Sequence, residues 1–454
     1  MAGFYFTATL TLIAFLLLGL AAGKKVRTGS DYTVAGRKAG TSAVTGILLG
    51  ALVGGGSTVG TVQMAYGYGL SAWWFTLGGG IGCLLLGLRF AGPLRRSELE
   101  TIPQFLSRSY GSPTGRIAMA AASAGTFISI VAQFLAGLAL LRSVLPLTTA
   151  QASSVLALSV AGFIFFGGLK SFGALGKAKI ALLYVVMGGC SAVAFLGGGL
   201  ESLATLPRTP YLSLFGRGLP KDLGALTSLV VGVFTTQIYI QAFFAASDEA
   251  SARRGAFLSA LLMPPLGLMG VHVGLVLRAR GVTTDPSQAL PLFIIEHFPP
   301  LMAGILWSGL FITVIGCAAG LILGVATNVS RDFLLPLLFK DATEGQSLRT
   351  SRLVVAVVVV LAALLGAGGE GSMILQWSYL SMGLRGAGTF FPFVVGILAP
   401  GRLHAPWALA ASVGGLTALF AAPLFTATEP LFAGLLVSGC LTALGMKKSG
   451  DTAP

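Results

Sequence analysis

The chain has 454 residues, of which 55% are hydrophobic and only 10% are charged, and its mean hydropathy is +0.87. This composition excludes a soluble protein and predicts a polytopic helical membrane protein. The formal net charge of +14 does not indicate nucleic-acid binding, because the basic residues follow the loops between the apolar segments.

About thirteen apolar segments of spanning length follow one another, and no polar stretch is long enough for a separate soluble domain. They are predicted at residues 4–22, 41–66, 71–92, 117–141, 150–168, 174–200, 223–245, 255–279, 299–326, 353–369, 371–399, 405–424 and 430–446. The first segment has no basic residue before it and Lys24 and Lys25 after it, which indicates a retained helix rather than a cleaved signal peptide. The four cysteines lie apart inside apolar segments, so neither a disulfide framework nor a transition-metal site is predicted.

The second segment is interrupted by the sequence VGGGSTVG at residues 53–60. A break of this kind frees backbone polar groups, which a membrane tolerates only beside a protein-lined cavity. Close helix packing is the alternative explanation for one glycine. Three consecutive glycines followed by Ser57 and Thr58 favour a broken helix with a solute site near the middle of the bilayer.

The basic residues predict the orientation of the chain. With the amino terminus outside, 22 of the 29 basic residues fall in inward loops, six fall in outward loops, and Arg385 lies inside a segment. Because basic residues collect on the cytoplasmic side, the amino terminus is predicted outside and the carboxyl terminus in the cytoplasm, in the cell (plasma or inner) membrane.

Several short motifs occur in a fixed order along the chain. They are Ala35–Arg37, Ala65–Leu70, Thr101–Leu106, Tyr110–Gly111, Gly167–Lys170, Gln237–Gln241, Ala245–Arg254, Ala318–Leu321 and Ser330–Asp332. Over roughly residues 1–400 the chain thereby resembles the sodium:solute symporter family, as an atypical member.

The resemblance implies an all-α fold of the leucine-transporter type, in which two five-helix repeats have inverted topology. One integral transporter domain is expected over residues 1–454, with a first helix and cytoplasmic loop at 1–40, repeats at 41–200 and 223–399, and two peripheral helices at 405–446. The second and seventh segments correspond in such repeats, so both are expected to be broken.

A broken helix also indicates the chemistry of the solute. The half-helix after the break directs its positive dipole end at the cavity, which favours a carboxylate. Family members that take sugars carry acid and amide side chains where this chain has Gly56 and Ser57, so a carboxylate or zwitterion is predicted rather than a polyol. The candidate solute contacts are Leu52, Gly55, Gly56, Ser57, Thr58, Gln63, Phe234 and Gln237. For both glutamines, a hydrogen bond between helices is an equal alternative.

The family's sodium site combines backbone carbonyls of the first broken helix with a carbonyl and two hydroxyls of a later helix. The resemblance matches this cation site to Gly50, Val53, Thr313, Gly316 and Cys317. Gly316 and Cys317 supply no hydroxyl, whereas sodium prefers oxygen ligands.

Two lysines offer an alternative to sodium. Many family members carry an acid at the start of the sixth segment, where this chain reads ALGKAK over residues 174–179. In sodium-independent transporters of the same superfold, a lysine on the corresponding helix takes the cation's place. The hypothesis is that Lys177 or Lys179 does so here and that its deprotonation couples transport to protons, since burial disfavours a charged amine. Otherwise both lysines reach the cytoplasmic headgroups.

Arg385 is predicted well inside a segment, where a charge normally faces a cavity or a partner. No acid lies securely within the apolar segments, so its counterion is the solute, a backbone carbonyl or Glu370 near a helix end. A segment boundary misplaced by one turn is the alternative. His272 relays protons or, more commonly, joins two helices by a hydrogen bond.

An enzyme would need clustered acids or histidines within the segments, and a channel would need polar rings along several helices. The sequence instead predicts a secondary active transporter that is not an enzyme, with a small solute and the lipid bilayer as partners and no nucleic acid. No cofactor is predicted beyond Na⁺ as the coupling ion. Sodium symport is slightly favoured by the resemblance, and proton coupling or exchange is the alternative; the solute and the oligomeric state are left open.

Overall fold

The computed structural model describes residues 1–23, 35–165, 168–282, 285–339, 341–425 and 429–447. Within these ranges the chain is helical and contains no strand, only two isolated β-bridges. The predicted all-α class is confirmed. Lys24 and Lys25, and Gly167 of the fifth motif, lie outside the described residues.

The helices of the first half are α1 (Ala2–Gly23), α3 (Thr41–Leu52), α4 (Thr61–Tyr68), α5 (Trp74–Leu85), α6 (Ala91–Arg96), α7 (Ile102–Tyr110), α8 (Ser112–Val144), α9 (Thr149–Phe165) and α10 (Gly168–Leu196). The later ones are α11 (Gly199–Ala204), α12 (Arg208–Tyr211), α13 (Leu219–Thr235), α14 (Gln237–Ala245), α15 (Glu249–Ala279), α16 (Ala289–His297), α17 (Pro300–Val329), α18 (Leu335–Leu338), α19 (Glu344–Gly368), α20 (Ile374–Leu398), α21 (Ala405–Phe425) and α22 (Pro430–Leu444). Short 3₁₀ or π turns join them at Ala35–Arg37 (η1), Gly56–Gly60 (η2), Gly69–Trp73 (η3), Leu86–Phe90 (η4), Pro286–Gln288 (η5) and Ser330–Leu334 (η6).

Membrane-spanning helices dominate the described chain. By length and composition, 8 helices could cross a membrane, or 9 if the bent pair α13–α14 is one span. Other predicted segments correspond to shorter apolar helices, at Ala2–Leu17, Thr41–Leu52, Thr149–Ile164 and Pro430–Leu444. A multi-pass membrane protein is therefore confirmed, whereas the number thirteen stays a prediction.

Several helices begin before the predicted apolar segments do, and two of them show the reason. The helix α19 begins at Glu344 rather than at 353, after a capping box formed by Thr343 and Gln346. The helix α15 begins at Glu249 rather than at 255, after Asp248 accepts a hydrogen bond from the Ser251 amide. Polar first turns satisfy the free amides of a helix, and hydropathy detects only the apolar part that follows them.

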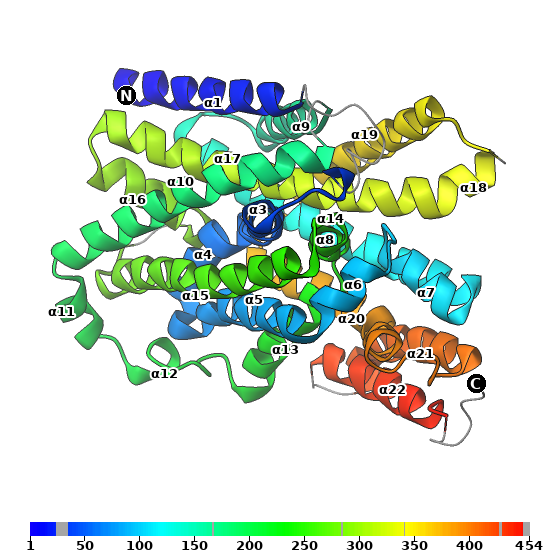
Figure 1. The fold of residues 1–454 in the computed structure, drawn as a ribbon. Coiled ribbons are helices and arrows are strands. Elements are labelled where there is room, and N and C mark those ends of the chain that lie inside the picture. Colours follow the sequence, from blue (N-terminus) through cyan, green and yellow to red (C-terminus); the bar gives the residue numbers. More distant parts are fainter. Residues whose placement is uncertain (24–34, 166–167, 283–284, 340, 426–428, 448–454) are drawn as a thin grey trace.

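The long helices surround α17, whose most apolar stretch is completely buried. The helices α1, α3, α8 and α10 contact α17, and α20 lies against both α8 and α13. In Figure 1, α1 and the pair α21–α22 lie on opposite flanks of the bundle, whereas α7 and α18 lie at one end and α11 and α12 at the other. These two ends are called the α7 end and the α11 end below.

The two halves meet at the α7 end. The Ala39 amide, just before α3, donates a 3.0 Å hydrogen bond to the Ala245 carbonyl at the end of α14, and the Ser247 amide returns a 2.9 Å bond to the Ala39 carbonyl. This bridge links the start of the first helix that is expected to be broken to the end of the second.

Glycine allows α10 to approach α3 closely. A β-carbon at Gly176 would lie 2.0 Å from the Gly46 carbonyl oxygen, so only glycine permits this separation. Residues three or four positions apart share a helix face, so the same contact brings Lys179 on α10 next to Gly50 on α3. The sequence thus places a lysine against the end of α3.

Candidate functional site

The first broken helix is confirmed. The helix α3 ends at Leu52, Val53 is extended with φ −92° and ψ 101°, and helical structure resumes at Gly56 as the π turn η2. The non-helical residues are therefore 53–55, and Ser57 and Thr58 already belong to the following helix rather than to the unwound stretch. All these residues are buried.

Two amides freed by the break have side-chain partners. The Gly54 amide donates a 2.9 Å hydrogen bond to the Ser57 hydroxyl, and the Gly55 amide donates a 2.7 Å bond to Oε1 of Gln133 on α8. The Ser57 and Thr58 hydroxyls donate in turn to the Gly54 carbonyl, at 3.1 and 2.9 Å. Both predicted hydroxyls therefore stabilise the break itself.

Gln133 gives the first testable prediction. Replacing it by leucine leaves the buried Gly55 amide unsatisfied, which costs about 1–3 kcal/mol. Gln133→Leu is expected to lower the thermal midpoint of the purified protein, whereas Gln376→Leu, at an exposed position of α20, is expected to change it little. Equal midpoints for Gln133→Leu and the wild type would contradict this role.

Two carbonyls are freed on the other side of the break. In a continuous helix, the amides of residues 54 and 55 would bond the carbonyls of residues 50 and 51. Here the Lys179 ammonium nitrogen donates a 2.5 Å hydrogen bond to the Gly50 carbonyl, and the Cys317 thiol on α17 donates to the Ala51 carbonyl at 2.8 Å. Neighbouring helices thus supply the donors that the broken helix lacks.

The predicted cation site contains the Lys179 side chain. Lys179 is 2% exposed, and a β-carbon at Gly316 would lie 3.5 Å from Lys179 Cδ and 3.8 Å from its Nζ. Cys317 is close enough for an electrostatic interaction with the ammonium group. The Lys179 side chain therefore lies alongside residue 316.

The other predicted cation-site residues are placed differently. The Thr313 hydroxyl donates to the Gly309 carbonyl of its own helix at 2.7 Å, and Val53 is the extended residue of the break. Lys177 is exposed and donates to the Ser42 hydroxyl at 3.1 Å. The interfacial alternative thus describes Lys177, whereas for the buried Lys179 it is wrong.

The second broken helix is also confirmed. The helices α13 and α14 meet at Thr236, which is extended with φ −92° and ψ 118°, and the pair is bent by 45°. Both expected breaks therefore exist. The Tyr239 ring, one turn after this break, lies close enough to Cys317 and to Arg385 for electrostatic interactions, so the two breaks border one central region.

The two predicted glutamines bond to the backbone of other segments. Gln63 Nε2 donates to the Ser372 carbonyl at 3.2 Å, and its Oε1 accepts from the Ile374 amide at 3.0 Å. Gln237 Nε2 donates to the Glu100 carbonyl at 2.7 Å, and its Oε1 accepts from the Ile102 amide at 3.0 Å. These bonds join different segments of the chain, as the alternative explanation for the two glutamines expects. Contact of either glutamine with a solute stays a prediction.

The remaining predicted solute contacts are apolar or small. Phe234 packs edge-on against Phe90 and Phe390, with ring centroids 4.8 and 5.6 Å away. A β-carbon at Gly56 would lie 3.1 Å from the Phe75 ring and 3.4 Å from the Ser378 hydroxyl. Leu52 is 3% exposed at the end of α3.

Arg385 lies within α20 and is completely buried, so a misplaced segment boundary is wrong. Its Nη1 donates to the Thr126 hydroxyl at 3.1 Å. Glu370 forms an ion pair with Arg142 and accepts from Thr149 at 2.6 Å, so it is not the counterion. His272 Nδ1 lies 2.9 Å from the Ser191 hydroxyl, which is the helix-joining role.

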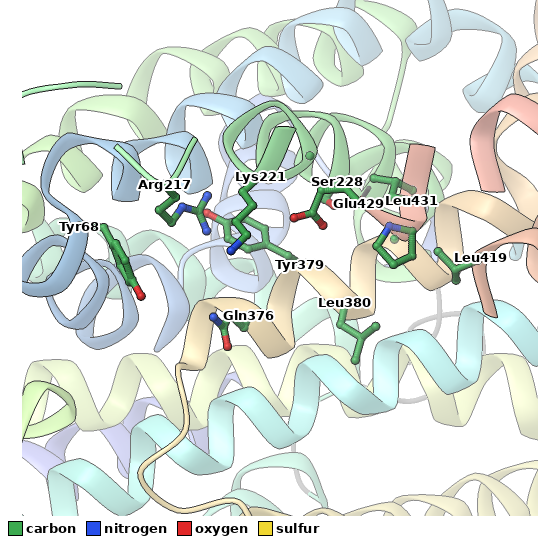
Figure 2. A pocket seen from close by; sticks show the side chains of 14 residues that line it. Tyr68, Arg217, Lys221, Ser228, Gln376, Tyr379, Leu380, Leu419, Glu429 and Leu431 are labelled. Atoms are coloured by element: carbon green, nitrogen blue, oxygen red, sulfur yellow. The ribbon is translucent and has the colours of Figure 1, made fainter. Parts of the chain in front are cut away.

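A groove opens at the α11 end, with a volume of about 340 Å³. Figure 2 shows Arg217, Lys221 and Glu429 around Tyr379, whereas Leu419 and Leu431 close the far side. Nη2 of Arg217 lies 2.7 Å from the buried Asp222 carboxylate, so this pair is neutral overall. Lys221 and Glu429 are the other two charged groups of the lining.

Sequence reasoning missed Gln133, Thr126 and Tyr239. Gln133 is a lone amide in an apolar stretch of α8, which was a usable signal. Thr126 and Tyr239 carry no such signal, because hydroxyl residues are common in membrane helices, and only the fold brings them to the break and to Arg385.

Comparisons with known proteins agree with this geometry. Residues 32–174 and 218–415 match the sodium:solute symporter family. The chain is similar to the sodium/proline symporter of Haemophilus influenzae, with 24% identity over 91% of this chain and 87% of that protein. It is also similar to the high-affinity choline transporter 1 of Drosophila melanogaster, with 23% identity over 78% of this chain and 60% of that one.

Solved structures support the fold. A Na⁺-coupled sialic acid symporter superimposes with a TM-score of 0.82 at 16% identity, covering 100% of this chain and 98% of that one. Mhp1, a nucleobase-cation-symport-1 family transporter, gives a TM-score of 0.51 at 14% identity, over 91% and 94% of the two chains. The fold is thus that of an inverted-repeat transporter, and the small-solute transport activity is that of its family. This chain belongs to the sodium:solute symporter family.

Proposed function

We propose that this chain carries a small organic carboxylate or zwitterion by alternating access, with the Lys179 ammonium group at the place where the family's sodium site is expected. Coupling is then to protons or by exchange of solutes. The hydrogen bond between Lys179 and the Gly50 carbonyl is the single observation that carries this proposal.

The ligands around Lys179 support the proposal. The Gly50 and Ala51 carbonyls already accept hydrogen bonds from Lys179 and Cys317. Gly316 and Cys317 supply no hydroxyl oxygen, which a hard cation requires. Two positive charges at one buried position also repel each other strongly. Sodium symport, which the family favours, requires Lys179 to leave this position first.

A change in the charge of Lys179 would alter the contact between the two repeats. The ammonium group on α10 holds α3 at its break, and the bridge at Ala39 links α3 to the end of α14. A neutral amine holds the carbonyl less strongly than a charged donor does. Proton release from Lys179 therefore favours movement of the broken helices, which is the step that alternating access needs.

The proposal also covers the location and orientation of the protein in the membrane. The basic-residue distribution supports the α7 end as cytoplasmic, with the amino terminus outside the cell membrane and the whole chain as one transporter domain. The activity proposed is transport rather than catalysis or channel conduction, with solute and lipid as partners.

Uptake into proteoliposomes tests the function. A panel of monocarboxylates, amino acids and vitamins is offered, with sodium and pH gradients imposed separately. We expect a carboxylate or zwitterion to accumulate with a pH gradient or by exchange in sodium-free buffer. A strict requirement for a sodium gradient would overturn the lysine proposal and favour sodium symport.

The groove at the α11 end allows a prediction about the pH dependence of transport. Burial raises the pKa of the Glu429 carboxyl above its ordinary value, and the nearby Arg217 and Lys221 only partly oppose this effect. On acidification Glu429 therefore loses its negative charge before an ordinary glutamate does, and the groove becomes more positive. As the pH is lowered, the KM for a carboxylate is therefore expected to fall.

Two variants isolate the effect of Glu429. Glu429→Gln is expected to show the low KM at every pH, because the groove has lost that negative charge permanently. Glu201→Gln, at an exposed residue of α11 outside the groove lining, should keep the wild-type pH profile. Initial uptake rates against solute concentration provide the measurement, and an unchanged profile in Glu429→Gln would contradict this role.

A further inference from the structure

Arg385 is a cation in the interior of the helix bundle without an ionic partner among the described residues. The side chain is 0% exposed, and within the described ranges Nε and Nη2 have no hydrogen-bond partner. A buried charge without an ion pair, and with two of its three donor nitrogens unbonded, is destabilising. The arrangement is therefore incomplete in the protein alone.

Three candidate counterions of Arg385 interact with other residues instead. Asp222 bonds Arg217, Glu370 bonds Arg142, and Asp332 accepts hydrogen bonds from Thr101 and Gln104. In the described part of the chain, no ion pair to Arg385 occurs. The described residues therefore do not supply the negative charge that Arg385 lacks.

The open edge of the guanidinium group has a definite shape. Thr126 on α8 accepts from Nη1, which is the terminal nitrogen on the Cδ side of the group. The remaining Nε and Nη2 point in the same direction and form the side-on edge that binds both oxygens of a carboxylate. A β-carbon at Gly125 would lie 2.5 Å from Arg385 Cγ, so the stem of the side chain is held in a slot on α8.

Arg385 also lies where a transported solute would pass. The helix α20 that carries Arg385 contacts both η2, which follows the first break, and α13, which precedes the second break. The arginine therefore borders the central region that both broken helices share.

We infer that the Nε and Nη2 edge of Arg385 binds the carboxylate of the transported solute, oriented by Thr126. This inference rests on the proposed function and narrows the substrate class to solutes with a carboxylate group. A single-atom anion such as chloride is the other source of negative charge, but it matches only one point of the two-donor edge.

Binding to the full-length protein in chloride-free detergent buffer tests the inference by thermal midpoint. The probes are propionate, lactate and alanine, each compared with its amide, which lacks the carboxylate, and sodium chloride at the same ionic strength. We expect at least one carboxylate to raise the wild-type midpoint, whereas the amides and chloride do not. Equal shifts with an amide or with chloride, or no shift with any carboxylate, overturn the inference.

Variants separate recognition from a structural role. Arg385→Met is expected to abolish the carboxylate shift and to raise the midpoint without ligand, because it removes an unpaired buried charge. Arg385→Lys should weaken carboxylate affinity at least tenfold, since an ammonium group lacks the two-donor edge, and Arg142→Met is the control that keeps the shift. A persistent shift in Arg385→Met, or a lower midpoint without ligand, overturns the inference.

This assay imposes no gradient, so its failure is distinct from failure of the coupling proposal. Sodium-dependent uptake of a carboxylate that binds through Arg385 would refute the Lys179 proposal alone. Sodium-independent, Lys179-dependent uptake of a neutral solute would refute the Arg385 inference alone.

Discussion

Proteoliposomes containing Lys179→Met are expected to lose the pH dependence of solute uptake and at least about fivefold of the initial rate. Methionine has a similar length but no donor, so the buried Gly50 carbonyl loses its partner. An unsatisfied buried acceptor costs about 1–3 kcal/mol, and about 1.4 kcal/mol corresponds to a factor of ten. The measurement is initial uptake at several external pH values in sodium-free buffer.

Lys177→Met is the matched control, because Lys177 is exposed and lies two residues away on the same helix. This variant should keep both the rate and the pH profile of the wild type. An unchanged rate and profile in Lys179→Met would remove the lysine from the mechanism.

The same site allows a gain-of-function test. The triple variant Lys179→Ala, Gly316→Ser and Cys317→Ser removes the ammonium group and supplies two hydroxyls. A β-carbon at Gly316 would make only ordinary van der Waals contacts, and the shortest of them is 3.5 Å to Cδ of Lys179 itself. A serine therefore fits at residue 316 once Lys179 is replaced by alanine. Uptake by this variant is expected to become sodium-dependent, whereas sodium-stimulated uptake by the wild type would contradict the proposal.

Gly55→Ala is expected to have the second large effect. The variant should lose about 1–3 kcal/mol or more of the free energy of unfolding, and it should also lose transport activity. A β-carbon at Gly55 would lie 2.3 Å from the β-carbon of Ala136 on α8 and 3.3 Å from Val314 on α17. The Ala136 β-carbon is fixed to its backbone and cannot rotate away, so α8 must move from the broken helix. The thermal midpoint and the uptake rate are measured together.

A methyl exchange provides the rescue. Gly55→Ala combined with Ala136→Gly removes the closest contact and is expected to recover most of the lost midpoint. Gly67→Ala is the control, because a β-carbon there has no atom within 4 Å and alanine favours a helix over glycine. If Gly55→Ala alone were as stable as the wild type, the close approach of α8 to the break would be contradicted.

Local sequence was enough to predict the first break and the family resemblance added the second, but neither predicted the bonds inside the breaks. The run VGGGSTVG removes side chains over three residues, which lowers helix propensity and permits close contacts. The unwound residues lie a few positions before Ser57, because the Ser57 hydroxyl caps the Gly54 amide. That choice depends on Gln133 taking the neighbouring amide, which is a long-range contact.

Lys177 and Lys179 also show what local sequence can predict and what depends on tertiary structure. Their spacing of two residues places them on different faces of one helix, so one face had to point inward. Which lysine is buried depends on the close approach of Gly176 to Gly46, and that distance is set by tertiary structure. The resemblance matched Gly316 and Cys317 to the cation site, but only the fold brought Lys179 beside them.

By itself, the sequence determined the solvent of the protein and its helical class from composition and hydropathy, its first interrupted helix from the local absence of side chains, and its family, with the second interrupted helix, from the order of its motifs. Only the tertiary structure decided that Lys179 rather than Lys177 reaches the Gly50 carbonyl, that both glutamines bond to backbone, and that Arg385 lacks an acid. Those outcomes depend on which distant groups satisfy each buried donor and acceptor, and that is settled only when all helices are in place.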